Sequence, residues 1–144
     1  MMEYKFRGFD AVGQKGWVYG DLVHNKKVTK SGLEDRVMVG GYEVLPNSVG
    51  LFTGMHDING KEIFEGDVVC KRDLTFNLQY KGVVVYNSAI GCFCIHSESK
   101  GTTMWMGFEA SDVYNDGQCT VPVKYEYEVI GNIYENIDLL NNNE

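Results

Sequence analysis

Carboxylate and amide side chains gather in one short segment of this 144-residue chain. The members are Asp57, Asn59, Glu62, Glu65 and Asp67. Paired carboxylates can transfer protons in a hydrolase, and clustered oxygen ligands can bind a divalent cation. The spacing does not match an EF-hand loop, since that loop has its glycine at about the sixth position and Gly60 is the fourth residue counted from Asp57.

The same segment carries two turn signals. Asn59-Gly60 tolerates positive φ at both centres of a type I′ turn, and Gly66-Asp67 repeats this chemistry before an apolar run. Carboxylates beside glycine and asparagine are also what β-turns usually contain. The pattern therefore predicts a structural turn motif, with a cation site or a carboxylate enzyme near Glu62–Asp67 as the alternatives. The motif residues are Asp57, Asn59, Gly60, Gly66 and Asp67.

Cys92, Cys94 and His96 have the spacing of one face of a β-strand. Same-face neighbours on a strand lie roughly 6.6–7 Å apart, whereas zinc needs its donors within about 2.0–2.3 Å. One strand positions the three poorly, and the sequence contains no Cys-x-x-Cys. We predict reduced, structural cysteines, no metal and no other cofactor. A Cys–His nucleophile pair stays an alternative, because such partners meet in space rather than in sequence.

Basic residues gather in one polar segment that lies between aromatic runs. They are Lys26, Lys27, Lys30 and Arg36. Barrel proteins combine such loops with stacking aromatic side chains to bind nucleic acid. Against this interpretation, residues 101–144 carry one basic residue and eight acidic ones, and the chain has a net charge of −7. An acidic surface repels phosphate, so a solvated loop is the simpler interpretation.

The elements that must position these residues are predicted to be strands. Apolar and aromatic residues alternate or cluster with the period and composition of β-structure. The expected strands are 3–9, 17–23, 36–44, 49–53, 68–70, 82–86, 91–96, 102–108 and 124–130. We expect the polar segment 24–35 to be a loop. Short helical turns are expected at 109–113 and 138–140.

The fold class predicted from this pattern is all-β. No helix-sized segment sustains a helical apolar period, and seventeen glycines with two prolines suit short strands joined by tight turns. Pro46-Asn47-Ser48 is a turn signal. It divides a predicted N-terminal β lobe, residues 1–48, from a barrel-like region, residues 49–144, unless the two form one continuous domain.

The N-terminus has no apolar core of a signal peptide, and no apolar run reaches the roughly 20 residues of a membrane span. These features predict a cytoplasmic protein with no membrane partner.

Two long motifs resemble the YopX family of phage and prophage proteins. They are Thr53-Gly54-x-x-Asp57-x-Asn59-Gly60-Lys61-Glu62-Ile63-x-Glu65-Gly66-Asp67-Val68-Val69 and Tyr127-Glu128-Val129-Ile130-Gly131-Asn132-Ile133-Tyr134-Glu135-Asn136. The segments 5–10 and 18–21 fit the family's N-terminal pattern, whereas residues 70–125 match in general character only. Ile137 stands where the family usually has proline after Glu-Asn.

The resemblance implies an all-β protein with an SH3-like barrel, encoded by a phage or prophage. The cytoplasmic location predicted above would then be that of the bacterial host cell. It implies no catalytic residue. Our first hypothesis is a non-enzymatic accessory protein that acts through protein contacts, as a homo-oligomer or with other phage or host proteins. The alternative is a nucleic-acid-associated regulator that uses the basic segment Lys26–Arg36.

Overall fold

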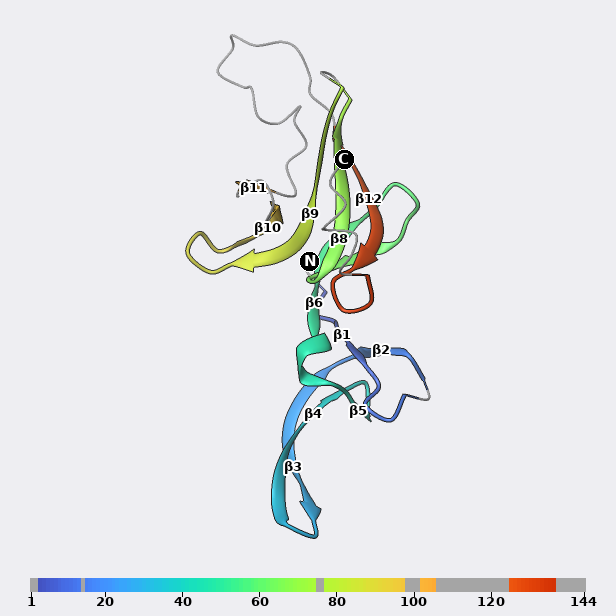
Figure 1. Cartoon of the computed structure of the whole chain (residues 1–144), viewed down its shortest axis with the longest axis vertical. Coiled ribbons are helices and arrows are strands. Elements are labelled where there is room, and N and C mark those ends of the chain that lie inside the picture. The colour runs from blue at the N-terminus through green and yellow to red at the C-terminus, as the bar shows by residue number, and fades with distance from the viewer. Residues whose placement is uncertain (1–2, 14, 75–76, 98–101, 106–124, 137–144) are drawn as a thin grey trace. The chain divides into compact units, whose positions relative to one another are not determined.

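The computed structural model of the chain describes residues 3–13, 15–74, 77–97, 102–105 and 125–136. These residues form antiparallel strands in three sheets, so the all-β prediction is confirmed (Figure 1). The SH3-like barrel stays a prediction. The chain divides into two compact units, residues 1–54 and 55–144. The turn signal in the sequence predicts this division a few residues earlier, after residue 48. Within the described part, no helix has the length and apolar character to cross a membrane.

Unit 1 opens with the predicted hairpin. β1 (Phe6–Phe9) pairs antiparallel with β2 (Trp17–Gly20), with Phe9 opposite Trp17. Asp10 closes the connection, because its carboxylate accepts hydrogen bonds from the backbone N–H groups of Val12 (3.0 Å) and Lys15 (3.2 Å). β1 also pairs with the start of β6 (Gly50–His56), a strand that runs from the first unit into the second.

The segment predicted to be a loop at 24–35 is instead a regular hairpin, and that prediction was wrong. β3 (Leu22–Thr29) pairs with β4 (Gly32–Val39) over their whole length. β5 (Tyr42–Glu43) then joins the other side of β4. The outer part of the hairpin is exposed. Without a buried side, its sequence lacks the apolar alternation from which a strand is usually recognised.

The core of unit 1 lies beside a close backbone approach, because Gly40 directly follows the buried Val39. Val18, Val39 and Val44 are buried together against side chains from the strands around them. Gly40 begins the turn between β4 and β5 with φ +60°, and a Cβ at this position would lie 2.3 Å from the carbonyl oxygen of Tyr19. Only glycine fits both the left-handed conformation and the space.

The predicted turn at Pro46–Ser48 is confirmed as a single 3₁₀ turn, η1. Ser48 fixes it to β1, since its Oγ accepts a hydrogen bond from the N–H of Phe9 (2.7 Å) and donates one to the carbonyl of Leu45 (2.6 Å).

Unit 2 is built on a five-stranded sheet with the order β11-β10-β9-β8-β12. The bounds of its strands are β7 Glu62–Phe64, β8 Asp67–Asp73, β9 Leu78–Asn87, β10 Cys92–Ser97, β11 Thr102–Trp105 and β12 Tyr125–Asn132. β7 follows the end of β6 outside this sheet. The hairpin predicted around residues 87–90 is confirmed as the β9–β10 connection. The helical turns expected at 109–113 and 138–140, and the predicted strand beyond residue 105, lie outside the described residues.

One face of this sheet forms the core of unit 2. Ile63, Val69, Val84, Ile95 and Tyr127 are buried in one cluster. Gly82 lets β9 approach β10 closely, because a Cβ there would lie 2.5 Å from the carbonyl oxygen of His96. The apolar runs that predicted these strands therefore supply the buried face.

Candidate functional site

The carboxylate of Asp57 organises the first turn of the motif. Its Oδ1 accepts hydrogen bonds from the backbone N–H groups of Asn59 (2.8 Å) and Lys61 (2.9 Å). The N–H of Gly60 also donates to the carbonyl of Asp57 (3.0 Å), and Gly60 alone of these residues has positive φ. The predicted type I′ turn centred on Asn59-Gly60 was therefore wrong. The turn runs from Asp57 to Gly60, and the Asp57 side chain accepts the N–H of Asn59, whose φ is not positive.

Asp57 also joins the two long sequence motifs. Its second oxygen, Oδ2, accepts a hydrogen bond from the N–H of Val129 in β12 (3.1 Å). The N–H of Ile58 donates to the carbonyl of Tyr127 (2.9 Å). Asp57 is only 7% exposed. Burial acts to raise the pKa of this carboxyl, but the donors of Val129, Lys61 and Asn59 outweigh it, so the pKa lies below its ordinary value.

Asp67 has a comparable role in the second turn. It is buried, and its Oδ2 accepts a hydrogen bond from the N–H of Phe64 (2.8 Å). Gly66 has φ +97°, and its carbonyl accepts a hydrogen bond from Ile133, which follows β12 (2.9 Å). This is a second link between the motif and the C-terminal segment.

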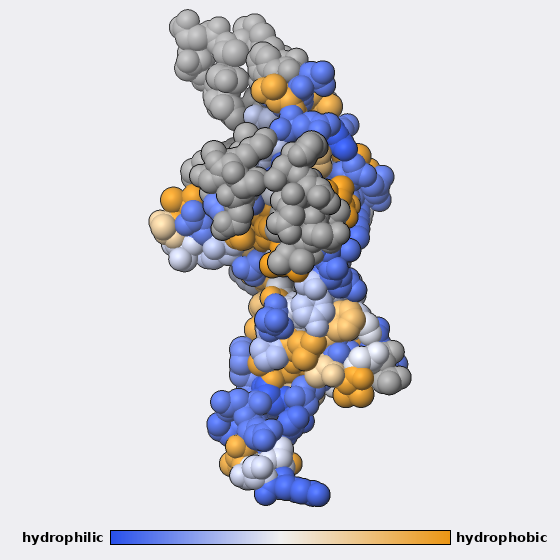
Figure 2. Space-filling model, viewed as in Figure 1, coloured by the Kyte–Doolittle hydropathy of each residue, from blue (hydrophilic) through white to orange (hydrophobic). Residues whose placement is uncertain are grey.

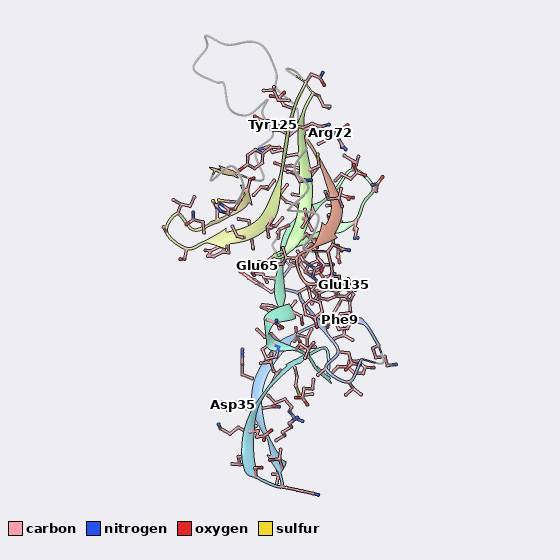
Figure 3. All side chains as sticks on the ribbon, viewed as in Figure 1. Phe9, Asp35, Glu65, Arg72, Tyr125 and Glu135 are labelled. Atoms are coloured by element: carbon pink, nitrogen blue, oxygen red, sulfur yellow. The ribbon has the colours of Figure 1, made fainter. Side chains whose placement is uncertain are left out.

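The two motif aspartates thus bind backbone amides, which is the role of structural turn residues. Glu62 and Glu65 are half-buried and flank the buried pair Ile63 and Phe64 in the sequence. Figure 3 labels Glu65. Among the described residues, no three His, Cys, Asp or Glu side chains come together in a way that could hold a metal ion.

Cys92 and Cys94 point toward one another from β10. Their Sγ atoms are 3.9 Å apart, closer than the strand repeat had suggested, because both side chains lean into the space between them. Burial raises the pKa of the Cys94 thiol, and its neighbour Cys92 adds to the shift. A thiol with a raised pKa is a poor nucleophile at neutral pH. His96 is half-buried further along the same strand.

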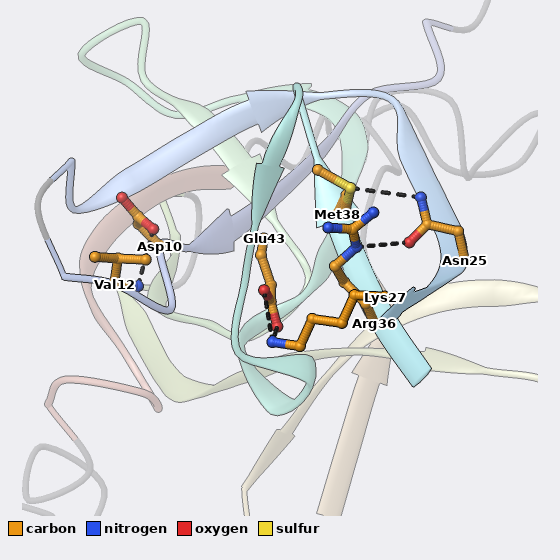
Figure 4. Close-up of polar contacts among 7 residues, drawn as sticks. All are labelled: Asp10, Val12, Asn25, Lys27, Arg36, Met38 and Glu43. Carbon is orange, nitrogen blue, oxygen red and sulfur yellow. Dashed lines mark hydrogen bonds and ion pairs between the residues drawn. The ribbon is translucent and has the colours of Figure 1, made fainter. Parts of the chain in front are cut away.

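The four basic candidates all lie on the β3–β4 hairpin, where acidic residues accompany them. Lys26 Nζ lies 2.6 Å from Asp35 Oδ1, and Lys27 Nζ lies 3.0 Å from Glu43 Oε2. Arg36 donates from Nε to Asn25 Oδ1 (2.8 Å) (Figure 4). Lys30 lies in the exposed turn after β3. The ion pairs reduce the positive field that a phosphate backbone would meet.

A row of side chains across three strands of unit 2 was not predicted from the sequence. Lys71 in β8 stands opposite Tyr80 in β9 and Tyr127 in β12. The next row on the same face places Asp73 opposite Leu78 and Tyr125. This face is the continuation of the core, since Val69 precedes Lys71 by one strand repeat. These residues are Lys71, Asp73, Leu78, Tyr80, Tyr125 and Tyr127.

Lys71 is 6% exposed, and its ammonium lies against aromatic rings. Nζ is 4.0 Å from the ring centre of Tyr125 and 5.6 Å from that of Tyr127. These distances are those of cation–π interactions, which help to offset the cost of burying a charge.

The other face of the same strands carries an ion-pair ladder. Arg72 Nη2 lies 2.7 Å from Glu128 Oε1, and Arg72 Nη1 lies 4.0 Å from Glu126 Oε1. Both glutamates are in β12. The hydrogen bond that the Arg72 guanidinium donates to Glu128 is the main reason why the pKa of Arg72 is raised. Tyr125 stands opposite Asp73, whereas Arg72 stands opposite Glu126 (Figure 3 labels Arg72 and Tyr125). Because successive residues of a strand face opposite sides, charge pairing marks one face of these strands and the aromatic cluster the other.

A hollow of about 230 Å³ lies beside this aromatic cluster. The described residues that line it are Lys71, Asp73, Leu78, Gln79, Tyr80 and Tyr125. A buried cation, a carboxylate and tyrosine rings around one hollow make it a candidate binding site. The signal in the sequence was the repeated two-residue spacing of Tyr125 with Tyr127, of Lys71 with Asp73 and of Leu78 with Tyr80.

Comparison with known proteins identifies the family. The family model described as YopX protein matches residues 5–141. A crystal structure of protein EF1440 from Enterococcus faecalis is similar, with a TM-score of 0.46 and 22% sequence identity, over 97% of this chain and 99% of that one. No curated protein matches. Because the family model spans nearly the whole sequence and includes both long motifs, this chain belongs to the YopX family.

Proposed function

We propose that this chain is a non-enzymatic protein-interaction module, encoded by a phage or prophage, that associates with a second copy of itself through the β3–β4 hairpin. Membership of the YopX family, which the sequence motifs relate to phage and prophage proteins, supports the proposed phage or prophage origin. The contact is supported by one observation, namely the apolar pair that the hairpin exposes near its tip.

The apolar pair consists of Val28 and Leu33. They lie directly opposite one another in the hairpin and are 83% and 66% exposed. By strand alternation they share a face with Val37 and Val39, which pack in the core of unit 1. Figure 2 shows hydrophobic atoms near the end of this otherwise hydrophilic hairpin. Burial of each side chain against a partner would contribute about 1.5–3 kcal/mol.

The edge of β3 offers a second element of the contact. The order β3-β4-β5 leaves β3 at the edge of its sheet, and this eight-residue strand has neither a proline nor a bulge to prevent pairing. Lysines on an edge usually discourage association, but Lys26 and Lys27 are paired with Asp35 and Glu43.

A second copy of the chain suits this surface because the surface is self-complementary. A twofold contact places the same residues on both sides. The exposed Lys26 and Asp35 of one copy can then exchange ion-pair partners with those of the other. Two β3 edges can likewise pair through their backbones.

We expect purified protein to associate reversibly, with a mass that rises with concentration in sedimentation equilibrium. Val28→Lys should weaken this association at least tenfold, because it removes apolar burial and places another cation on the edge strand. The matched control is Val12→Lys, an exposed valine in the turn between β1 and β2 (73% exposed), which should leave the association constant unchanged.

Two results would contradict the proposal. One is a wild-type protein that stays monomeric at every concentration tested. The other is an equal effect of Val28→Lys and Val12→Lys, which would indicate a general charge effect rather than a contact at the hairpin.

A further inference from the structure

We propose that Cys92 and Cys94 together chelate one soft, thiolate-seeking metal cation of low coordination number, represented by Cu⁺. The site lies in unit 2 alone, and it goes beyond the self-association proposed for the β3–β4 hairpin. Three observations carry the proposal: the distance between the two sulfur atoms, the pairing of the strand that holds them, and the number of donors.

The two sulfur atoms have the separation of a chelating pair. Cys92 Sγ and Cys94 Sγ are 3.9 Å apart. Metal–thiolate bonds of about 2.3 Å hold two sulfur atoms about 3.8 Å apart in a tetrahedral centre and about 4.0 Å apart in a trigonal one. Both sulfur atoms can therefore bind one cation without a large movement of either side chain. The cation replaces the two thiol protons, which are released to solvent.

The strand suits a bridging metal better than a disulfide between the same two residues. A disulfide would require the sulfur atoms to close to about 2.05 Å, and it usually joins Cα atoms no more than about 6.8 Å apart. Residues two apart on a strand have Cα atoms roughly 6.6–7 Å apart. β10 is held at this extension by its pairing with β9 on one side and β11 on the other, where Cys94 stands opposite Val85 and Trp105.

The same pairing prepares the two donors for a ligand. Because both cysteines stand on a strand with a hydrogen-bonded neighbour on each side, little backbone freedom remains to be lost when a cation binds. Such preorganisation increases affinity by reducing the entropy cost of binding.

The number of donors selects the metal. In the part of the chain that the structure describes, no third His, Cys, Asp or Glu side chain joins the pair in a metal-binding group. Zn²⁺ is almost always four-coordinate in structural sites, so two cysteines would leave half of its positions to other ligands. Thiolates are ligands that select Cu⁺, a monovalent ion that is stable with two or three of them.

The burial of the pair also favours a soft cation. Cys94 is 1% exposed, whereas Cys92 is half-buried. A cation must therefore shed most of its water to reach the Cys94 sulfur. Mg²⁺ loses its water reluctantly and prefers oxygen ligands, so we expect the pair to discriminate against it.

The test uses the full chain, reduced and kept under argon, with ascorbate to maintain Cu⁺. Competition with bicinchoninate, a coloured Cu⁺ chelator, should show tight binding of one Cu⁺ per chain. Cys92→Ser should weaken this binding at least tenfold, because one of the two thiolates is lost. Cys70→Ser is the matched control, since Cys70 is a half-buried cysteine in β8 outside the pair, and it should bind Cu⁺ as the wild type does. Zn²⁺, measured against a coloured zinc chelator, should bind the wild type at least tenfold more weakly than Cu⁺.

A second variant separates chelation from a general effect of Cys92→Ser. Cys94→Ala removes the other thiol without burying a hydroxyl group, and it should weaken Cu⁺ binding to the same extent, because a chelate needs both donors. Circular dichroism checks that each variant is folded, and Cys92→Ser decides the matter if Cys94→Ala is not. The proposal is overturned if the wild type binds no Cu⁺, if either folded variant binds Cu⁺ as the wild type does, if Cys70→Ser loses as much affinity, or if Zn²⁺ binds as tightly as Cu⁺.

Discussion

Replacement of Gly40 with alanine should lower the free energy of unfolding of unit 1 by about 3 kcal/mol or more. The left-handed backbone costs a residue with a Cβ about 1–2 kcal/mol, and overpacking typically adds about 1–3 kcal/mol. Both costs apply at Gly40, where φ is +60° and the new Cβ would lie 2.3 Å from the carbonyl oxygen of Tyr19. The neighbour is backbone and cannot turn aside. Urea denaturation followed by tryptophan fluorescence measures the change, because Trp17 lies in this unit.

The adjacent Gly41 provides the control. It also has positive φ, +89°, but a Cβ there would meet no atom within 4 Å. Gly41→Ala should therefore show the backbone cost alone, about 1–2 kcal/mol. Equal losses for the two variants would show that the close approach of Tyr19 to Gly40 has no energetic importance.

The second large effect is expected at Asp57. Asp57→Ala removes the acceptor of three backbone N–H groups, one of them on β12. Hydrogen bonds to charged groups contribute about 1.5–3 kcal/mol each, and the loop amides can regain water, so we expect a loss of about 3–4 kcal/mol. Asp57→Asn should lose less stability than Asp57→Ala, because the amide oxygen can still accept the hydrogen bonds of Asn59 and Lys61. The hydrogen bond from Val129 is lost, since the NH₂ group of asparagine is itself a donor. Thermal and urea unfolding measure both variants.

The control for Asp57 is Asp35→Ala, which removes an exposed carboxylate paired with Lys26. Exposed ion pairs contribute little to stability, so this variant should unfold nearly as the wild type does. A loss at Asp57 no larger than the loss at Asp35 would mean that the link between the two motifs does not stabilise unit 2.

Acid should remove the contribution of Asp57. Its pKa in the folded protein lies below the ordinary carboxyl value of 3.8. The carboxylate therefore stabilises the fold fully at pH values above that value, and the stabilisation is lost as the pH falls from there through the folded pKa. The difference in unfolding free energy between the wild type and Asp57→Asn should be constant near neutral pH and should shrink below about pH 4. A constant difference down to pH 2 would contradict the assignment.

Much of the fold follows from local sequence. Aromatic and β-branched runs such as Trp17–Gly20 and Cys92–Ser97 form strands where they were predicted, because each of them buries apolar side chains. The hairpin of β3 and β4 was not predicted, because most of its residues are exposed and its strands are held by cross-strand pairs. A pattern of burial cannot reveal a strand that is not buried.

The candidate site was less predictable than the fold. The sequence drew attention to the carboxylates of Asp57 and Asp67, which in the structure bind backbone amides. It gave no reason to connect Lys71 with Tyr125, because the antiparallel pairing of β8 with β12 brings these two residues together. The register of that pairing is set by backbone hydrogen bonds between segments that are far apart in the sequence.

The amino-acid sequence alone determined the all-β class, the turn at Pro46–Ser48 and the family, because apolar period, turn residues and motifs are local properties. Only the tertiary structure decided the role of the chemically suggestive residues. Asp57 became a link between two motifs when the N–H of Val129 came within reach, and Lys71 became a buried cation when β12 placed two tyrosines beside it. Both outcomes depend on which strands become neighbours. The free energy that stabilises one strand order over another comes from many contacts across the whole sheet, not from any local segment of the sequence.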